Sequence, residues 1–289
     1  MNDTAVTNDQ FTRFWNDVLV EKFERFRNIM MEGMSLHSRV PFRTLDVPRG
    51  SRVLDVGCGW GDTAIELARK TGPDGSVLGL DCCDAFLEKG RADARAAGLE
   101  NVRFVVADVQ THKFERDYDL CFSRFGMMFF SNPVAAMRNV RSALKPGGRL
   151  AFVVWRTIDD NPFLGLPKRV VLSFLPAPGE DAATCGPGPF SMASPDVVGA
   201  QLKAAGFVDS TFTRVDGPVM VGRDLEQAID FQMALGPAGE TVREAGCEAE
   251  RRKDEIQRAL RAELARHTQP DGSIVLDSSS WTIIARNPG

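Results

Sequence analysis

The 289-residue chain has few of the side chains that often build catalytic and metal sites. It contains one tyrosine, three histidines and six cysteines, and no two cysteines have the C-x-x-C spacing of a zinc or redox motif. The sequence therefore predicts no metal site, and it predicts reduced thiols in a cytoplasmic protein. The cysteines are Cys58, Cys82, Cys83, Cys121, Cys185 and Cys247.

Long apolar runs and blocks of one charge are missing as well. No apolar stretch approaches the ~20 residues that span a bilayer, and Met1 is followed by polar residues rather than by the leader of a secreted protein. The net charge is −4, without a basic block or an arginine-rich arm. We therefore expect neither membrane insertion nor a nucleic-acid partner. A homo-oligomer is left open.

The most informative feature that is present is an apolar strand, residues 53–56, that runs into a glycine turn. The turn has G-x-G-x-G spacing at Gly57, Gly59 and Gly61, and Asp62 stands where a dinucleotide-binding turn has its third glycine. The turn opens a helix, whose N-terminus attracts anions. Carboxylates beside the turn would nevertheless repel a pyrophosphate and attract a cation. The turn thus favours a cationic ligand.

Four further landmarks follow the glycine turn along the chain. Residues 76–81 and 102–108 are apolar runs that end in an acid, and residues 118–123 predict a fourth strand. Residues 144–150 form a helix-stopping turn that leads into a fifth strand. Together with the turn, these motifs resemble class I S-adenosylmethionine-dependent methyltransferases over roughly residues 50–156.

Two segments point to one branch of this family. Residues 123–126 and 144–148 look most like the branch that contains ubiquinone and menaquinone biosynthesis methyltransferases. The insertions of this chain depart from those compact enzymes, which puts a quinone acceptor in doubt.

The resemblance implies an α/β fold with a doubly wound, mostly parallel seven-stranded sheet, Rossmann-like, over residues 50–289. The cofactor then lies at the carboxyl ends of the strands. Residues 1–49 are helical in period, and they serve either as a lid over the cofactor or as ordinary packing. Insertions are predicted at 157–195, rich in Pro and Gly, and at 224–268, helical and charged. Strands near 207–216 and 280–285 should pair antiparallel at the end of the sheet.

The resemblance also implies S-adenosylmethionine as the cofactor and assigns its contacts. Asp81 would accept both ribose hydroxyls, Asp108 would take the adenine amino group, and the N–H of Val109 would pair with the adenine ring. The predicted cofactor-binding residues are Asp55, Gly57, Cys58, Gly59, Gly61, Asp81, Cys82, Asp108, Val109 and Ser123.

The acceptor side is less defined by the sequence. Methyl transfer from a sulfonium needs mainly alignment and exclusion of water, and it needs a base only when the nucleophile arrives protonated. Of the three histidines, His37 is the preferred catalytic base because its segment could close over the site, with a surface or capping role as the alternative. The predicted substrate-binding residues are Trp60, Arg124, Met128 and Trp155. Core packing for the apolar ones and a loop contact for Arg124 are the alternatives.

The sequence thus predicts methyl transfer to a small-molecule acceptor through an oxygen, nitrogen, sulfur or carbon nucleophile. The alternative is a non-catalytic binding or assembly protein with the same fold. Because the motif glycines and the motif acids are all present, we favour the enzyme.

Overall fold

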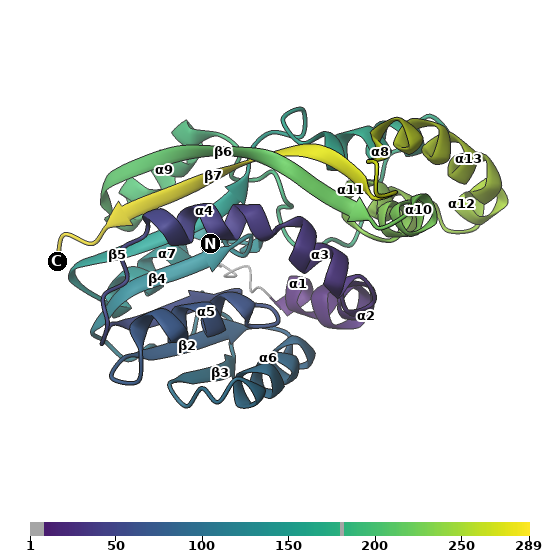
Figure 1. The fold of residues 1–289 in the computed structure, drawn as a ribbon. Helices are drawn as coiled ribbons and strands as arrows, with labels where there is room; N and C mark the ends of the chain where they lie inside the picture. Colours follow the sequence, from purple (N-terminus) through teal and green to yellow (C-terminus); the bar gives the residue numbers. More distant parts are fainter. Residues whose placement is uncertain (1–8, 180–181) are drawn as a thin grey trace, which may run out of the picture.

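The computed structural model describes residues 9–179 and 182–289. Within these residues, seven strands form one sheet in the order β3-β2-β1-β4-β5-β7-β6 (Figure 1). The first five strands are parallel, and β7 runs antiparallel to both β5 and β6. The strands are β1 (Arg52–Val56), β2 (Ser76–Asp81), β3 (Val102–Val106), β4 (Tyr118–Arg124), β5 (Leu144–Trp155), β6 (Val208–Gly222) and β7 (Ile274–Arg286). The predicted fold class is confirmed.

Helices precede, connect and extend this sheet. Before the first strand lie α1 (Asp9–Phe14), the π-helical turn η1 (Trp15–Leu19), α2 (Val20–Arg25), α3 (Arg27–Gly33) and α4 (Ser35–Thr44). Between the parallel strands lie α5 (Asp62–Thr71), α6 (Asp84–Ala96), the short 3₁₀ turn η2 (Met127–Phe129) and α7 (Pro133–Ala143). After β5 come α8 (Pro162–Leu172), α9 (Pro195–Ala205), α10 (Leu225–Ala234), α11 (Gly236–Ala245), α12 (Cys247–Arg251), α13 (Lys253–Leu264) and η3 (Ala265–His267).

Local sequence explains several of the helix ends. The Asn132 side chain accepts the N–H of Ala135 at the start of α7, with a proline in the first turn, as the order Asn-Pro predicts. Ser194 caps α9 in the same way, and Gly206 ends that helix with a φ of 89°. These caps fix where the helices that flank the sheet begin and end.

Helices cover both faces of the sheet, so the central residues of its parallel strands are mostly apolar and buried. Side chains of β1 alternate: Val53 packs with α4, α5 and α6 on one face, and Leu54 and Val56 pack with α7 and α9 on the other. On the first face, Phe42 of α4 stacks on Phe122 of β4 with ring centroids 4.9 Å apart.

The antiparallel hairpin is longer than predicted. The pairing of β6 with β7 continues to Gly222 and Ile274, beyond the end of β5, and the long hairpin reaches the helices that the two insertions supply (Figure 1). Helix α8 from the first insertion packs against α11 and α13 from the second, and α10 packs on both α11 and α13. The two insertions thus form one helical cluster at that end of the molecule.

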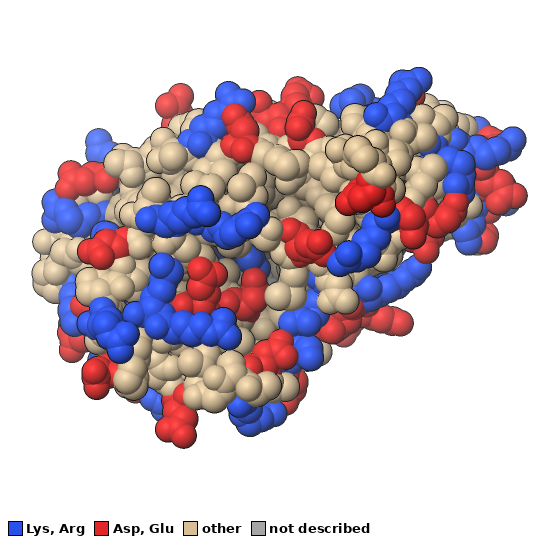
Figure 2. Space-filling model, in the orientation of Figure 1, with Lys and Arg blue, Asp and Glu red and all other residues tan. Residues whose placement is uncertain are grey.

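The outer surface of this cluster carries both charges, in the insertion that the sequence predicts to be helical and charged. Arg252 pairs with Glu255 and Arg266 pairs with Glu263, each one helical turn apart. Figure 2 shows Lys and Arg interspersed with Asp and Glu over the cluster. The structure thus agrees with a mixed-charge, solvent-facing surface.

The N-terminal segment is helical from Asp9 to Thr44, as predicted, and its residues 1–8 lie outside the described part of the chain. Helices α3 and α4 both contact β6, so the first helices pack on the hairpin formed by the last strands. None of the helices in the described ranges is long and apolar enough to cross a membrane.

Candidate functional site

The glycine turn after β1 depends on its three glycines. Gly57, Gly59 and Gly61 have φ values of 64°, 52° and 75°, in the left-handed region that other residues rarely occupy. A Cβ at Gly57 would lie 3.0 Å from the Cα of Gly126, where the turn after β4 approaches, and a Cβ at Gly61 would lie 2.5 Å from the Phe104 ring. A Cβ at Gly59 would meet no described atom within 4 Å. Space for a ligand therefore opens above Gly59.

Asp81, at the end of β2, holds this turn in place. Its two carboxylate oxygens accept the N–H of Gly59 at 2.8 Å and the N–H of Cys83 at 3.0 Å. Burial raises the pKa of Asp81, and these hydrogen bonds oppose the rise. Each carboxylate oxygen can accept a further hydrogen bond. The predicted ribose acid thus has a structural task that the sequence did not reveal.

Two buried polar atoms near the turn lack partners among the described residues. Asp55, fully buried in β1, accepts the Thr63 hydroxyl at 2.6 Å through one oxygen, while its other oxygen has none. The hydroxyl of Ser123, at the end of β4, has none either. Burial, above all other causes, raises the pKa of Asp55 to about 7. Unsatisfied buried polar groups are costly and rare, so these atoms fit a ligand that supplies hydrogen bonds.

The remaining predicted cofactor residues lie at the same edge of the sheet. The N–H of Cys58 donates to the carbonyl of Leu80 at 3.0 Å, and the N–H of Ala107 donates to the carbonyl of Asp81 at 2.9 Å. These bonds place the ends of β1, β2 and β3 side by side. Asp108 accepts the Gln110 N–H at 2.9 Å through one carboxylate oxygen.

Val109 and Cys82 complete the predicted cofactor set. Val109 is buried, and its carbonyl accepts the Asn139 side chain at 2.7 Å. Cys82 is half-buried in the loop after β2. The structure therefore brings all ten predicted cofactor residues to the carboxyl edge of β1 to β4, and their individual contacts with the cofactor stay predictions.

His37 lies in α4 and is fully buried. Its Nδ1 is 2.8 Å from the Ser280 hydroxyl and its Nε2 is 2.7 Å from the Ser278 hydroxyl, both on β7. Burial is the main cause that lowers the pKa of His37 to about 4, so the ring is neutral at pH 7. The alternative of a surface position is wrong, and the general-base role stays a prediction. A base would first have to release one serine.

Two of the predicted substrate residues belong to an aromatic and sulfur-rich core beside β4 and β5. Trp155 is 4 % exposed and stacks on Phe125 with ring centroids 3.9 Å apart. Phe125 holds a φ of 58°, strained for a side chain of its size. Met128 is 2 % exposed, and its carbonyl accepts the Ser191 hydroxyl at 2.7 Å. Trp155 and Met128 are therefore packed in the core, in agreement with the core-packing alternative.

Arg124, at the end of β4, is paired rather than free. Its guanidinium lies 2.9 Å from the carboxylate of Asp62 at the start of α5, and it donates to the Ser38 hydroxyl of α4 at 2.5 Å. In place of the alternative, a bond to a loop carbonyl, Arg124 forms an ion pair with α5 and a hydrogen bond with α4. Its contact with a substrate stays a prediction.

Trp60 lies within the glycine turn, under the N-terminal helices. Its Nε1 donates to the Glu24 carboxylate at 2.6 Å, and its ring contacts Phe23 and Phe86. Helix α2 thus covers the outer side of the turn. Whether residues 1–49 serve as a lid over the cofactor or as ordinary packing stays a prediction.

Trp15 links segments around the candidate site, and the sequence analysis did not single it out. Its Nε1 donates to the carbonyl of Cys185 in the first insertion at 3.1 Å, and its ring meets that of Phe129 edge-on at 5.2 Å. It therefore joins the N-terminal helices, the insertion and the end of β4. Trp15 lies in the segment that the sequence predicts to be helical, but the helical period gave no sign that its indole N–H would bind a loop.

The comparisons with known proteins agree with this geometry. Residues 53–148 match the methyltransferase domain family. Aklanonic acid methyltransferase DauC from Streptomyces sp. (strain C5) is 36% identical over 104 residues, which are 36% of this chain and 47% of that protein. Demethylmenaquinone methyltransferase from Staphylococcus aureus is 31% identical over 150 residues, which are 51% of this chain and 61% of that protein. The chain thus spans roughly half to three fifths of these curated relatives.

A solved structure supports the fold over a longer stretch. The YcgJ protein from Bacillus subtilis aligns with 88% of this chain and 99% of its own, with a TM-score of 0.58 and 18% sequence identity. The family match contains the glycine turn, Asp81 and Asp108. Residues 53–148 thus resemble a methyltransferase domain, as the motifs in this stretch predict.

Proposed function

We propose that this chain binds S-adenosylmethionine at the carboxyl edge of β1 to β4 and transfers its methyl group to a small-molecule acceptor. The observation that carries the proposal is the open space above Gly59, bordered by a carboxylate that already holds the turn. Asp81 offers acceptor positions for ribose hydroxyls, and the unpartnered oxygen of Asp55 suits the positive end of the cofactor.

The residues present fit this cofactor better than a dinucleotide. The buried carboxylate of Asp55 in β1 would repel a pyrophosphate, whereas it attracts a ligand that carries a sulfonium and an ammonium. The unpartnered hydroxyl of Ser123 lies at the end of the next strand and can serve as donor or acceptor. When bound, S-adenosylmethionine supplies an activated methyl group for in-line displacement.

The chain's own contribution is alignment and exclusion of water. Trp60 and Phe23 pack together over the glycine turn, and Trp15 joins the N-terminal helices to the first insertion. A reaction between an activated donor and a positioned nucleophile gains most of its acceleration from such alignment. His37 stays our candidate base for an acceptor that arrives protonated, and it would have to exchange a serine partner for the substrate proton.

Two relatives support a small-molecule acceptor. By name, one acts on aklanonic acid and the other on demethylmenaquinone. We propose an acceptor of that size and leave its nucleophilic atom among oxygen, nitrogen, sulfur and carbon. The free thiols of all six cysteines support the proposal of a reducing, cytoplasmic compartment.

Titration calorimetry with S-adenosylmethionine and S-adenosylhomocysteine tests the proposal first. We expect binding of one cofactor per chain, followed by transfer of a labelled methyl group to one member of a panel of small phenols, quinols, amines, thiols and carbon acids. A folded chain that binds neither compound would contradict the proposal and favour the non-catalytic alternative. Binding without transfer to any panel member would support the proposed cofactor but argue against these acceptor classes.

A further inference from the structure

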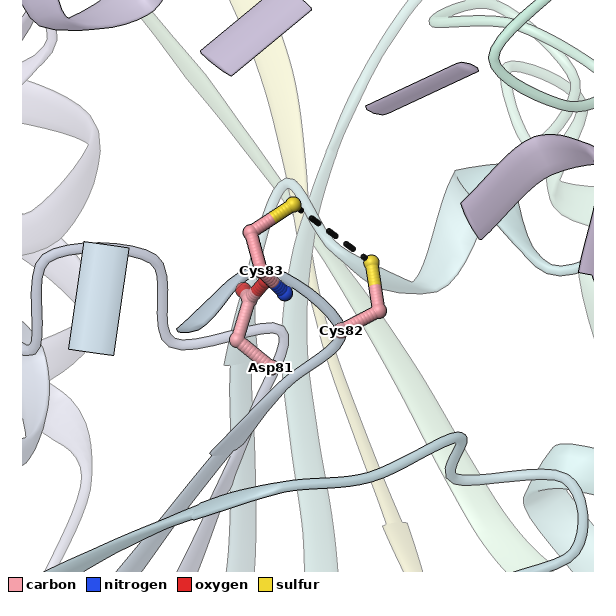
Figure 3. Close-up of side chains that lie close together, drawn as sticks. All are labelled: Asp81, Cys82 and Cys83. Atoms are coloured by element: carbon pink, nitrogen blue, oxygen red, sulfur yellow. Dashed lines mark hydrogen bonds between the residues drawn. The ribbon is translucent and has the colours of Figure 1, made fainter. Parts of the chain in front are cut away.

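Three potential metal ligands adjoin one another where β2 ends. Asp81, Cys82 and Cys83 are consecutive, and their ligand atoms all lie within 4.8 Å of one another. Figure 3 shows the two sulfur atoms facing each other across a dashed contact, next to the Asp81 carboxylate. The Sγ atoms are 3.8 Å apart. Both cysteines are free thiols.

We propose that Asp81, Cys82 and Cys83 form a binding site for a thiophilic divalent metal ion such as Zn²⁺. A tetrahedral zinc ion with Zn–S bonds of about 2.3 Å holds its two sulfur atoms about 3.8 Å apart. The two thiols already have that separation, so the loop needs little rearrangement to accept the ion. The carboxylate supplies a third ligand, and water can supply the fourth.

The surroundings of the thiols suit such a site. Apolar side chains of the N-terminal helices pack around this loop, among them Trp15, Phe23 and Met30. Asn16 of the same segment donates to the Cys82 carbonyl at 3.2 Å, and Asp81 accepts the Cys83 N–H. Hydrogen bonds to the ligands and an apolar shell hold a coordinating loop in one conformation.

Metal binding at this site has a simple balance. One divalent ion enters, the two thiols become thiolates, two S–H bonds break, and two protons leave to the solvent. No electron is transferred. The calorimetric signal in buffers of different ionisation enthalpy therefore counts the protons released per ion.

The metal site would overlap the cofactor site, and this part of the inference rests on the proposed function. Asp81 is the ribose acid of the proposed cofactor site. Its carboxylate cannot coordinate the ion and accept the ribose hydroxyls at the same time. We therefore expect Zn²⁺ and the cofactor to compete. Competition would make methyl transfer sensitive to the free concentration of thiophilic metal ions.

The direct test uses the whole chain without cofactor. Zn²⁺ is titrated against a chromophoric chelator, and we expect one ion per chain, with affinity at least about tenfold lower in Cys82→Ser and in Cys83→Ser. Cys247→Ser is the matched control, because Cys247 is a free, exposed thiol in α12 and should leave binding unchanged. Unchanged zinc affinity in the double variant Cys82→Ser/Cys83→Ser would overturn the proposal.

Further measurements distinguish loss of a metal ligand from misfolding of a variant. Cys83 is fully buried, so its variant is checked by circular dichroism, and Cys82→Ser, at a half-buried position, carries the test if Cys83→Ser does not fold. With Cd²⁺, the wild-type chain should show a thiolate-to-metal charge-transfer band that is weakened in Cys82→Ser. The same band at full strength in that variant would contradict the assignment.

The competition is measured separately, with S-adenosylhomocysteine titrated in the presence and absence of one equivalent of Zn²⁺. A weaker cofactor affinity with zinc in the wild type, and no such effect in Cys82→Ser, supports the overlap. Zinc binding without any cofactor binding would contradict the proposed function and leave the metal site standing. Binding of both with no mutual effect would refute the overlap.

Discussion

The glycine turn and the His37 pocket both contain buried polar groups, but they differ in whether these groups have hydrogen-bond partners. Around the turn, one oxygen of Asp55 and the hydroxyl of Ser123 are buried without partners, and Gly59 faces open space. In the His37 pocket, both ring nitrogens have serine partners within 2.8 Å. The contrast agrees with the first region as our proposed ligand site, whereas the hydrogen bonds of the second link α4 to β7.

The largest effect that would test this contrast is loss of cofactor binding in Gly59→Ala. Its methyl group would project into the open space, so we expect cofactor affinity to fall at least about 100-fold, or ~2.7 kcal/mol. The stability cost should be only the strain of a left-handed alanine, about 1 kcal/mol. Calorimetry measures the first and urea unfolding the second.

Gly98→Ala is the matched control for that experiment. Gly98 also has a positive φ, 65°, and open space around its Cβ position, but it follows α6 at the opposite end from the turn. We expect the same loss of stability and unchanged binding. Equal affinities in the two variants would show that the cofactor does not lie over Gly59.

In contrast to Gly59→Ala, His37→Gln should lower the stability of the fold and leave cofactor affinity nearly unchanged. The pKa of His37 falls from an ordinary 6.5 to about 4 mainly through burial. A group with a lowered pKa in the folded state stabilises above its ordinary pKa, and that contribution is lost as the pH falls toward 4. We expect the wild type to lose up to about 3 kcal/mol from this group between pH 6.5 and 4.

The variant should lack that pH-dependent component, and at pH 7.5 it should unfold about 1–3 kcal/mol more easily because serine hydroxyls lose partners. Urea unfolding across this pH range measures both. Cofactor affinity is expected to stay within about threefold, or ~0.7 kcal/mol, of wild type. A collapse of methyl transfer with unchanged cofactor binding and stability would instead support the general-base role.

Asp81→Asn sharpens the contrast, because Asp81 holds the turn and is also the proposed ribose acid. An amide keeps one acceptor oxygen but cannot hold both the Gly59 and Cys83 N–H groups. We expect cofactor affinity to fall about tenfold to thirtyfold, and unfolding to become about 1–2 kcal/mol easier. Unchanged affinity together with lowered stability would reduce Asp81 to a structural residue.

The smallest expected effect is a pH dependence of binding that Asp55 creates. Burial raises its pKa from 3.8 to about 7, so the stability that this group contributes at low pH is lost as the pH rises from 3.8 to about 7. A cationic ligand binds the ionised form better, and affinity should rise by up to about tenfold from pH 6 to pH 8. In Asp55→Asn the rise should vanish. The same slope in both proteins would place the titrating group elsewhere.

The sequence predicts the sheet half of this molecule well because its signals are local. The strand, the glycine turn and the acid at the tip of β2 follow one another along the chain, so the motif order alone brings Asp81 and Gly59 together. The serines that bind His37 lie 241 and 243 residues away, and no local pattern links them to it. Burial of His37 was therefore not predictable.

The covering elements were predictable in type but not in position. An apolar helical stripe shows that one face is buried, but it does not show what that face packs against. Trp15 and Trp60 illustrate this point, since each is polar at one end and finds its partner in a distant segment. For the same reason, the packing of the two insertions into one helical cluster followed from nothing in either insertion alone.

The strand order also determines when the sheet can be completed during synthesis. β7 is the last strand along the chain, yet it lies between β5 and β6. Until residues 274–286 leave the ribosome, β6 has no strand to pair with and the edge of β5 stays open. Completion therefore depends on contacts between distant parts of the chain, which form slowly and leave apolar edges exposed in the meantime.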